Sequence, residues 1–270
     1  MPSDSPDRLS TALAVSAPKG PLRPVGLALQ VVETVAELQP VGASDLSRTM
    51  ALPKATVHRL LLALEGFGWL ERDQGGRPLW SVSMKPVAIA GRAIERKNGL
   101  RIVSLTIMDS LRRATSETVH LGVLEGERVV LFERIDGLAT IGAFLAVGTS
   151  WDMHWSSAGK AILAHLPEAY QQAYLAVPRF RRRSETEILP AAELAAELAQ
   201  IRAQGFAITE GSRPAASSSV GAAIFDKQGM PFAGLSINGA ADRLRAEQLM
   251  ALAPKVVDAA RSISMGMSIS

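Results

Sequence analysis

The sequence predicts an α+β protein with two domains, a smaller one in the first third of the chain and a larger one after residue 100. In the first third, three segments with helical periodicity precede a pair of short strand-like runs. After residue 100, strand pairs alternate with helices, and the last helix carries apolar residues at spacings of 3 and 4. Strand pairs separated by helices are typical of an antiparallel sheet that helices cover.

The bulk properties limit the class of protein. The chain has 270 residues, enough for two domains, and 47% of them are apolar. It has no cysteine, which excludes disulfides, thiolate nucleophiles and Cys-type zinc sites. No apolar run approaches the ~18 residues that span a bilayer. Residues 1–20 are polar and rich in proline, so we expect a disordered tail rather than a secretory signal, and a cytoplasmic protein.

The net charge of +3 is unevenly placed along the chain. Residues 1–98 hold 12 Lys and Arg against 9 Asp and Glu, and the rest of the chain holds 17 of each. Residues 46–64 contain Arg48, Lys54 and Arg59 and no acidic residue. A basic surface confined to one end of a nearly neutral protein indicates a polyanionic partner for that end.

Three helices are expected between residues 24 and 66. The first follows Pro24, and the second is a short helix over residues 44–50. Pro53 opens the third helix, at the position where a missing N–H costs nothing, and Gly66 and Gly68 end it. The apolar residues at helical spacing are Leu27, Val31, Val35 and Leu38 in the first helix and Val57, Leu60, Leu61 and Leu64 in the third.

A hairpin is expected directly after the third helix. Strand-like runs at residues 69–72 and 78–83 flank the turn sequence Asp73-Gln-Gly-Gly76. Three helices followed by such a hairpin form a winged helix-turn-helix, a DNA-binding domain, which we place at residues 21–83.

The larger domain is expected over residues 100–270, after a linker helix over residues 84–99 that Asn98-Gly99 closes. Its sheet is expected to be antiparallel, with helices covering it. The expected strands are 117–124, 128–135, 139–146, 219–226 and 231–238. The expected helices are 101–114, 156–165, 190–204 and a last one with the stripe Leu249, Leu252, Val256, Ala259 and Ile263.

The exposed face of the third predicted helix carries small residues and hydrogen-bond donors. Ala55 and Thr56 are small enough for close approach to DNA, and Lys54, His58 and Arg59 can donate. An Arg can read a guanine bidentately, worth roughly 1–3 kcal/mol of discrimination, and a Lys commonly meets phosphate. The alternative is the ordinary solvated face of a core helix. The short preceding helix, the following hairpin and the acid-free stretch favour DNA.

The hairpin supplies one further candidate contact. Arg77 lies near its tip and can reach the minor groove or the phosphates, although an ordinary solubilising charge is an equal interpretation. The predicted DNA contacts are Lys54, Thr56, His58, Arg59 and Arg77.

An enzyme and a ligand sensor that does not bind DNA are the two alternatives. The sequence has no GxSxG, GxGxxG, Walker or HExxH motif. His120 lies among apolar strand residues and is expected to be a core residue whose hydrogen bonds are satisfied, and His154 and His165 lack a usual metal-ligand spacing. We therefore predict no metal and no cofactor. A Ser–His–Asp triad of Ser219, His154 and Asp152 is conceivable, but the spacing does not favour it over chance.

Five motifs recur along the chain in the order of a known family. They are Ala51-Leu-Pro-Lys-Ala-Thr-Val-His-Arg-Leu-Leu61, Glu117-Thr-Val-His-Leu121, His154-Trp-Ser-Ser-Ala-Gly-Lys-Ala161, Phe225-Asp-Lys-Gln-Gly229 and Leu235-Ser-Ile-Asn-Gly239. Over about residues 22–265 the chain resembles the IclR family of bacterial transcription regulators.

The resemblance implies a winged helix-turn-helix, a dimerising linker helix and a C-terminal ligand-binding domain similar to GAF domains. Such proteins usually act as dimers or dimers of dimers on palindromic operators, and they respond to small carboxylates or aromatic acids. Family contacts with DNA fall on positions matching Thr56 and Arg59, with Lys54 nearby. A repressor is the default expectation, because repression needs only occlusion of the promoter, although the family also contains activators.

The resemblance also implies an effector site, at positions that carry Met153, Thr209, Ser219, Ser236 and Asn238. Thr209 replaces a common acidic residue, Ser219 a frequent cysteine and Asn238 a hydroxyl residue. Hydroxyls and backbone N–H groups can hold a carboxylate without a cation. A last departure is Ala51, where the family usually has glycine; if this residue must be left-handed, alanine costs roughly 1 kcal/mol.

Overall fold

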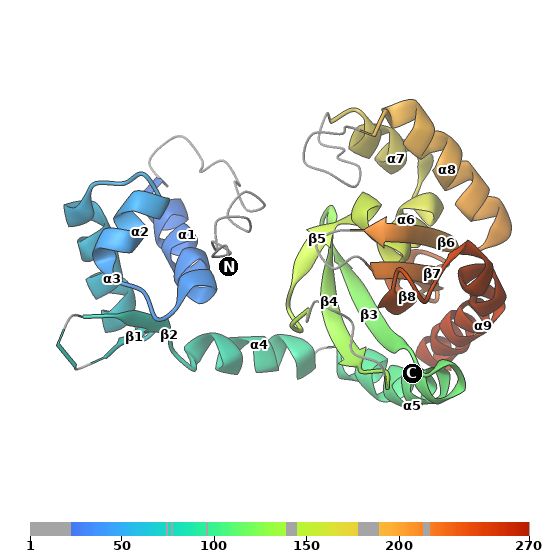
Figure 1. The fold of residues 1–270 in the computed structure, drawn as a ribbon, viewed down its shortest axis with the longest axis horizontal. Helices are drawn as coiled ribbons and strands as arrows, with labels where there is room; N and C mark the ends of the chain where they lie inside the picture. Colours follow the sequence, from blue (N-terminus) through green and yellow to red (C-terminus); the bar gives the residue numbers. More distant parts are fainter. Residues whose placement is uncertain are drawn as a thin grey trace. The chain divides into compact units, whose positions relative to one another are not determined.

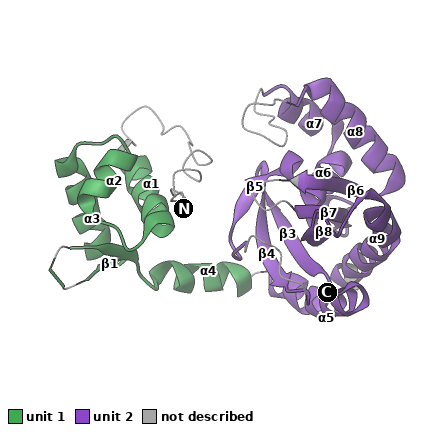
Figure 2. Ribbon diagram, viewed as in Figure 1, with its two compact units in different colours: residues 1–96 green, residues 97–270 purple. Residues whose placement is uncertain are grey.

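The computed structural model describes residues 23–73, 75–76, 78–95, 97–138, 145–177, 189–212 and 217–269. The chain divides into two compact units, residues 1–96 and residues 97–270 (Figure 2). Both units have the predicted α+β character, and within the described residues no helix is both long and apolar enough to cross a membrane.

The first unit is a winged helix-turn-helix, as predicted. Its elements are α1 Arg23–Leu38, α2 Ala43–Thr49, α3 Lys54–Gly66, β1 Leu70–Arg72, β2 Trp80–Val82 and α4 Lys85–Glu95 (Figure 1). Val31 and Val35 of α1, Leu46 of α2, and Val57 and Leu61 of α3 meet in one apolar core. The helical spacing of these residues in the sequence therefore identifies the helix faces that are buried in this core.

The hairpin is attached to the helices by backbone pairing. Besides its antiparallel pairing with β1, β2 pairs with Val41. The Val41 N–H donates to the Trp80 carbonyl at 3.0 Å, and the Val41 carbonyl accepts from the Trp80 N–H at 2.9 Å. The Val82 N–H donates to Oε1 of Gln39 at 2.8 Å. The segment between α1 and α2 thus adds to the edge of the hairpin and fixes it beside α3.

The second unit is built on a six-stranded antiparallel sheet with the order β5-β4-β3-β8-β7-β6. The strands are β3 Thr118–Glu125, β4 Arg128–Ile135, β5 Ser150–Asp152, β6 Ala207–Ser212, β7 Ser217–Phe225 and β8 Pro231–Ala240. The helices are α5 Asn98–Thr115, the 3-10 turn η1 Met153–Trp155, α6 Ser157–His165, α7 Glu168–Leu175, α8 Ala191–Gln204 and α9 Ala246–Ile269.

The two faces of the sheet are covered by different helices (Figure 1). Val119, Leu121 and Val123 of β3 point to a core shared with α5 and α9. The alternate residues of β3 point to the other face, where α6 lies, because side chains alternate along a strand. Leu194 and Leu198 of α8 join the core on the α6 side.

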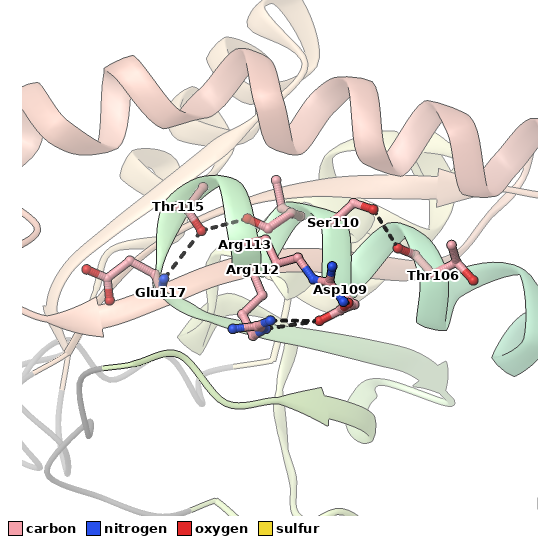
Figure 3. A network of polar contacts seen from close by, with 8 residues as sticks. Thr106, Asp109, Ser110, Arg112, Arg113, Thr115 and Glu117 are labelled. Atoms are coloured by element: carbon pink, nitrogen blue, oxygen red, sulfur yellow. Dashed lines mark hydrogen bonds and ion pairs between the residues drawn. The ribbon is translucent and has the colours of Figure 1, made fainter.

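The junction between α5 and β3 is fixed by local polar contacts (Figure 3). Ser116 ends the helix in a left-handed conformation, and its N–H donates to the Arg112 carbonyl at 2.7 Å. The Thr115 hydroxyl donates to Leu111 at 2.8 Å and accepts from the Glu117 N–H at 3.4 Å. Glu117 in turn accepts two hydrogen bonds from Arg243, so the start of β3 is tied to the segment before α9.

The ion pairs on α5 strengthen the same end of the helix (Figure 3). Asp109 accepts from Arg112 at 3.0 Å and pairs with Arg113 at 2.7 Å. The hydrogen bond from Arg112 lowers the pKa of the Asp109 carboxyl below its ordinary value. Two arginines in the last turn also interact favourably with the carbonyl end of a helix.

Several boundaries differ from the sequence-based expectation. Asn98 begins α5 instead of closing the linker helix. Residues 139–144 of the expected strand 139–146 lie outside the described residues, and 145–146 are not in a strand. The short strand β5 pairs with β4 instead. Neither α7 nor β6 was expected, because α7 is short and β6 has no clear alternation of apolar residues.

Candidate functional site

Two exposed cations lie on α3, Lys54 in its first turn and Arg59 on its outward face. Val57 and Leu61 are buried, while Lys54 and Arg59 are exposed and Thr56 is half-buried beside them. Within the described part of the chain, neither Lys54 nor Arg59 forms an ion pair or a side-chain hydrogen bond. These side chains can therefore meet an anion without first breaking an internal contact.

Two of the other polar residues near this face have internal partners. Arg48 pairs with Asp45, so its charge is compensated. The exposed ring of His58 packs edge-to-face on Trp80, with ring centroids 6.1 Å apart. The contact joins α3 to the hairpin and restricts the directions in which His58 can donate.

Arg77, the predicted hairpin contact, lies outside the described residues. In β1, Arg72 pairs with Glu65 of α3 at 3.2 Å. Sequence reasoning missed Leu62, which is 41% exposed on the same outward face as Arg59. Its position three residues after Arg59 was the available signal, because residues three apart share a helix face.

The turn before α3 places Ala51 in the left-handed conformation that alanine disfavours. Ala51 has φ of 50°, in the left-handed region. The Leu52 N–H donates to the Ser47 carbonyl at 3.1 Å, and the Ser47 hydroxyl donates back to the Leu52 carbonyl at 2.6 Å. These two hydrogen bonds hold the turn closed even though alanine is disfavoured there.

Two neighbouring rows of cross-strand partners, the polar rows, cross the second unit's sheet on the face that α6 covers. The first row, from β6 to β3, consists of Thr209, Ser219, Asn238 and Thr118. The second row, from β7 to β4, consists of Gly221, Ser236, His120 and Arg134. Three of the predicted effector residues therefore share one row, and Ser236 lies in the next.

The first turn of α6 rests directly on the sheet beside the polar rows. A Cβ on Gly221 would lie 2.7 Å from the Ala158 nitrogen, and one on Gly234 would lie 2.9 Å from the Ala158 oxygen. The Ser156 hydroxyl caps the helix by accepting from the Gly159 N–H at 3.0 Å. The other N–H groups of a first turn have no intrahelical acceptor and favour an anion.

Hydroxyl and amide groups line this contact between helix and sheet. The Ser157 hydroxyl donates to the Ser219 hydroxyl at 2.8 Å. The Asn238 amide donates to the Ser236 hydroxyl at 3.0 Å. The hydroxyl oxygen of Thr209 is buried and has no hydrogen-bond partner among the described residues. The polar rows thus offer donors and one unsatisfied hydroxyl, with no acidic side chain among them.

Met153, the fifth predicted effector residue, is not a member of the polar rows. Its side chain is fully buried in the apolar core that α6 shares with α8. The Met153 carbonyl occupies the space where a side chain on Gly159 would lie. In the described structure Met153 supports the start of α6 through packing.

His120 is the titratable residue of the second row. It is only 8% exposed, so the expected core position is confirmed, but its ring forms no hydrogen bond with any described residue, so the expectation of a satisfied histidine is not met. Burial lowers the pKa of His120 to about 4, with a further lowering by the charge of Arg134, and Asp136 opposes both. The imidazole is therefore neutral at pH 7.

No catalytic or metal constellation is formed within the described residues. Ser219 bonds Ser157, His154 bonds the Tyr174 hydroxyl at 2.8 Å, and Asp152 pairs with Arg128 at 3.0 Å. The conceivable Ser–His–Asp triad is therefore wrong. In the same described ranges no three His, Cys, Asp or Glu side chains lie close enough to hold a metal ion.

Two family models match the chain. The model described as Bacterial transcriptional regulator IclR C-terminal matches residues 93–265, and the IclR helix-turn-helix domain matches residues 27–74. The HTH-type transcriptional regulator BhcR of Paracoccus denitrificans is 31% identical over 92% of this chain and 88% of its own length. The Transcriptional repressor IclR of Escherichia coli is 25% identical over 94% of this chain and 93% of its own.

Solved structures share the fold. The IclR structure from Thermotoga maritima matches with a TM-score of 0.70 at 23% identity, covering 90% of this chain and 98% of that one. An IclR homolog from Microbacterium hydrocarbonoxydans, solved as a complex with 4-hydroxybenzoate, matches with a TM-score of 0.72 at 24% identity over the same shares of the two chains.

Proposed function

The chain belongs to the IclR family of bacterial transcriptional regulators, and we propose that it binds a palindromic operator through α3 and responds to a small carboxylate. The family members it resembles are regulators and not enzymes. We place its action in the cytoplasm, where operator DNA is found.

The proposal of DNA binding rests on two exposed cations of α3, Lys54 and Arg59, whose side chains form no ion pair within the described residues. Arg59 lies at the centre of the outward face, opposite the buried Val57 and Leu61, and Lys54 lies on its shoulder. Arg59 is suited to a base edge and Lys54 to a phosphate, with small Ala55 and Thr56 allowing close approach. The exposed Leu62 adds an apolar group that can contact a thymine methyl.

A second copy of the chain is the proposed partner of α4. No described residue of α4 is buried, and Val87 and Ile89 are 57% and 47% exposed. An amphipathic helix without a partner in its own chain gains stability by packing on its equivalent in a two-fold dimer. Such a dimer presents two α3 helices, which matches a palindromic operator.

The effector part rests on the start of α6 and the polar rows. Backbone N–H groups of the first turn, the Ser157 and Ser219 hydroxyls and the Asn238 amide can hold a carboxylate. The relative from Microbacterium hydrocarbonoxydans was solved with such an acid, 4-hydroxybenzoate. Binding there changes DNA affinity only by the difference in effector affinity between two arrangements of the dimer. We take repression as the default outcome.

The experiment that tests the proposal is DNA binding by the full chain. Genomic fragments retained at low salt are isolated, and affinity for the strongest site is measured across a salt series by fluorescence anisotropy. We expect affinity to fall steeply as salt rises. Arg59→Ala should weaken specific binding about 5- to 150-fold, the equivalent of roughly 1–3 kcal/mol.

Arg261→Ala is the matched control, because Arg261 is an exposed arginine on α9, in the other unit. It should leave operator affinity unchanged. Failure of any genomic fragment to be retained at low salt would exclude the proposed function. Equal losses in the two variants would exclude α3 as the helix that reads the DNA.

A further inference from the structure

His120 and Thr209 are the two members of the polar rows whose side chains form no hydrogen bond among the described residues, and His120 is the one with two ring nitrogens. Its neighbours in the rows are engaged: Ser236 accepts from Asn238, and the Thr118 hydroxyl accepts from the Gly137 N–H at 3.1 Å. Among the described residues, none forms a hydrogen bond with the His120 imidazole, although the residue is more than nine-tenths buried. Neither ring nitrogen is fully buried, so each keeps a small contact with solvent when the site holds no effector.

The direction of the His120 side chain follows from the strand register. Val119 and Leu121, its neighbours in β3, point to the core under α5 and α9. His120 therefore points to the opposite face, where its Cα partner on β8 is Ser236. It lies on the same face as Ser219, two strands away, or about 10 Å between backbones at the usual strand spacing.

We infer that His120 recognises a second polar group of the effector, an oxygen at the end of the molecule remote from its carboxylate. This inference rests on the proposed function, because it takes the carboxylate to lie at the start of α6. It narrows the effector class to acids with a hydroxyl or carbonyl several ångströms from the carboxylate. A simple unsubstituted acid would leave the imidazole unpaired.

The chemistry of the imidazole fits this class. A neutral imidazole has one donor nitrogen and one acceptor nitrogen, so it can pair with a hydroxyl as acceptor or donor and with a carbonyl as donor. The low pKa of His120, near 4, keeps the ring in that neutral form. A second carboxylate at this place is not required, because Arg134, the adjacent cation, is already paired with Asp136.

A site of this kind distinguishes two acids because the one without the second polar group leaves the imidazole without a hydrogen-bond partner. A site built to pair with a ligand hydroxyl rejects the analogue without it, because the buried partner then stays unsatisfied. We expect the preference to be about tenfold or more, which corresponds to one hydrogen bond of roughly 1.4 kcal/mol.

The test is isothermal titration calorimetry of the full chain with two matched pairs of acids. The pairs are benzoate with 4-hydroxybenzoate and hexanoate with 6-hydroxyhexanoate. The wild type should bind the hydroxylated member of at least one pair about tenfold more tightly. His120→Leu should remove that preference by weakening only the hydroxylated acid, and His120→Gln, which keeps a donor and an acceptor, should restore part of it.

Ser219→Ala is the matched comparison, because Ser219 belongs to the proposed carboxylate end. It should weaken both members of a pair equally. A cooperative thermal transition of the ligand-free His120→Leu protein shows that the variant folds.

Three outcomes would overturn the assignment. They are equal affinity of the wild type for both members of both pairs, no binding of any of the four acids, and a preference that survives in His120→Leu. DNA retention by the same preparations is measured separately. With intact salt-dependent DNA binding, equal affinities or a preference that survives in His120→Leu reject the role of His120 alone, and no binding of any acid also rejects the carboxylate site. Loss of DNA binding in the wild type rejects the regulator function.

Discussion

Ala51 adopts a backbone conformation that lowers the stability of the winged helix-turn-helix unit. Its φ of 50° is disfavoured for any residue with a Cβ, and the two hydrogen bonds between Ser47 and Leu52 hold it there. We expect Ala51→Gly to raise the free energy of unfolding by about 1 kcal/mol, measured by calorimetry. Ala63→Gly, in the middle of α3, is the control of opposite sign and should lower it by about 1 kcal/mol. A loss of stability in Ala51→Gly would contradict the left-handed turn.

His120 should make stability depend on pH. Its folded pKa, about 4, lies below its ordinary value of 6.5, with Arg134 and Asp136 as the charged groups that act on it. Between these values the unfolded chain binds a proton that the folded chain does not. Stability is therefore lost as pH falls from above 6.5 toward 4, by about 2 kcal/mol between pH 7.5 and pH 5. In thermal melts, His120→Gln should show a smaller difference between these pH values. An unchanged difference would indicate a solvated ring.

For single residues, the sequence predicted which side chains are exposed donors, but not which of them lie next to one another in the fold. Lys54 and Arg59 were predicted as exposed donors from helix period alone, and they are exposed. Thr209, Ser219 and Asn238 become one row only through the register of β6, β7 and β8. Such pairing joins residues far apart in the chain, and a local pattern does not encode it. The unpaired state of His120 depends on the same register.

The contact of α6 with the sheet is the element that organises the proposed effector site. Gly221 and Gly234 leave room for the Ala158 backbone, so a methyl group at either position must displace the helix. We expect Gly221→Ala to destabilise the protein by about 1–3 kcal/mol and to weaken carboxylate binding, as seen by thermal shift and calorimetry. Gly99→Ala in α5, where nothing lies within 4 Å, should be neutral or stabilising. Equal behaviour of the two variants would place α6 away from the sheet.

Helices and strands were predicted correctly where apolar residues recur at a clear helical or strand spacing. The long amphipathic stretches gave α1, α3 and α9, and the clear turn Asp226 to Gly229 gave the hairpin of β7 and β8. The edge strand β5 has three residues, too few to show alternation. Asn98 and Gly99 read as a helix end because these residues are common there, yet α5 begins with them.

At the scale of the whole molecule, the proposed packing of α4 on a second copy would link DNA binding to assembly. If a second copy covers the exposed Val87, a charge there should separate the subunits. We expect Val87→Asp to shift the protein toward monomer in sedimentation and to lower operator affinity at least tenfold, because only one α3 then engages. Met250→Asp, on exposed α9 surface, should change neither property. A Val87→Asp protein that sediments like the wild type would show that α4 is not the contact between subunits.

The two glycines that α6 rests on, Gly221 and Gly234, which we call the glycine floor, also matter for engineering. A designer who wants this regulator to report a different metabolite needs positions that can vary without collapsing the receptor. Gly221 and Gly234 are poor targets, because any side chain there meets the Ala158 backbone. Positions 120, 209, 219, 236 and 238 present their side chains beside that floor, on the face that α6 covers. A combinatorial library confined to these five codons, with both glycines held constant, should yield biosensor variants that still fold.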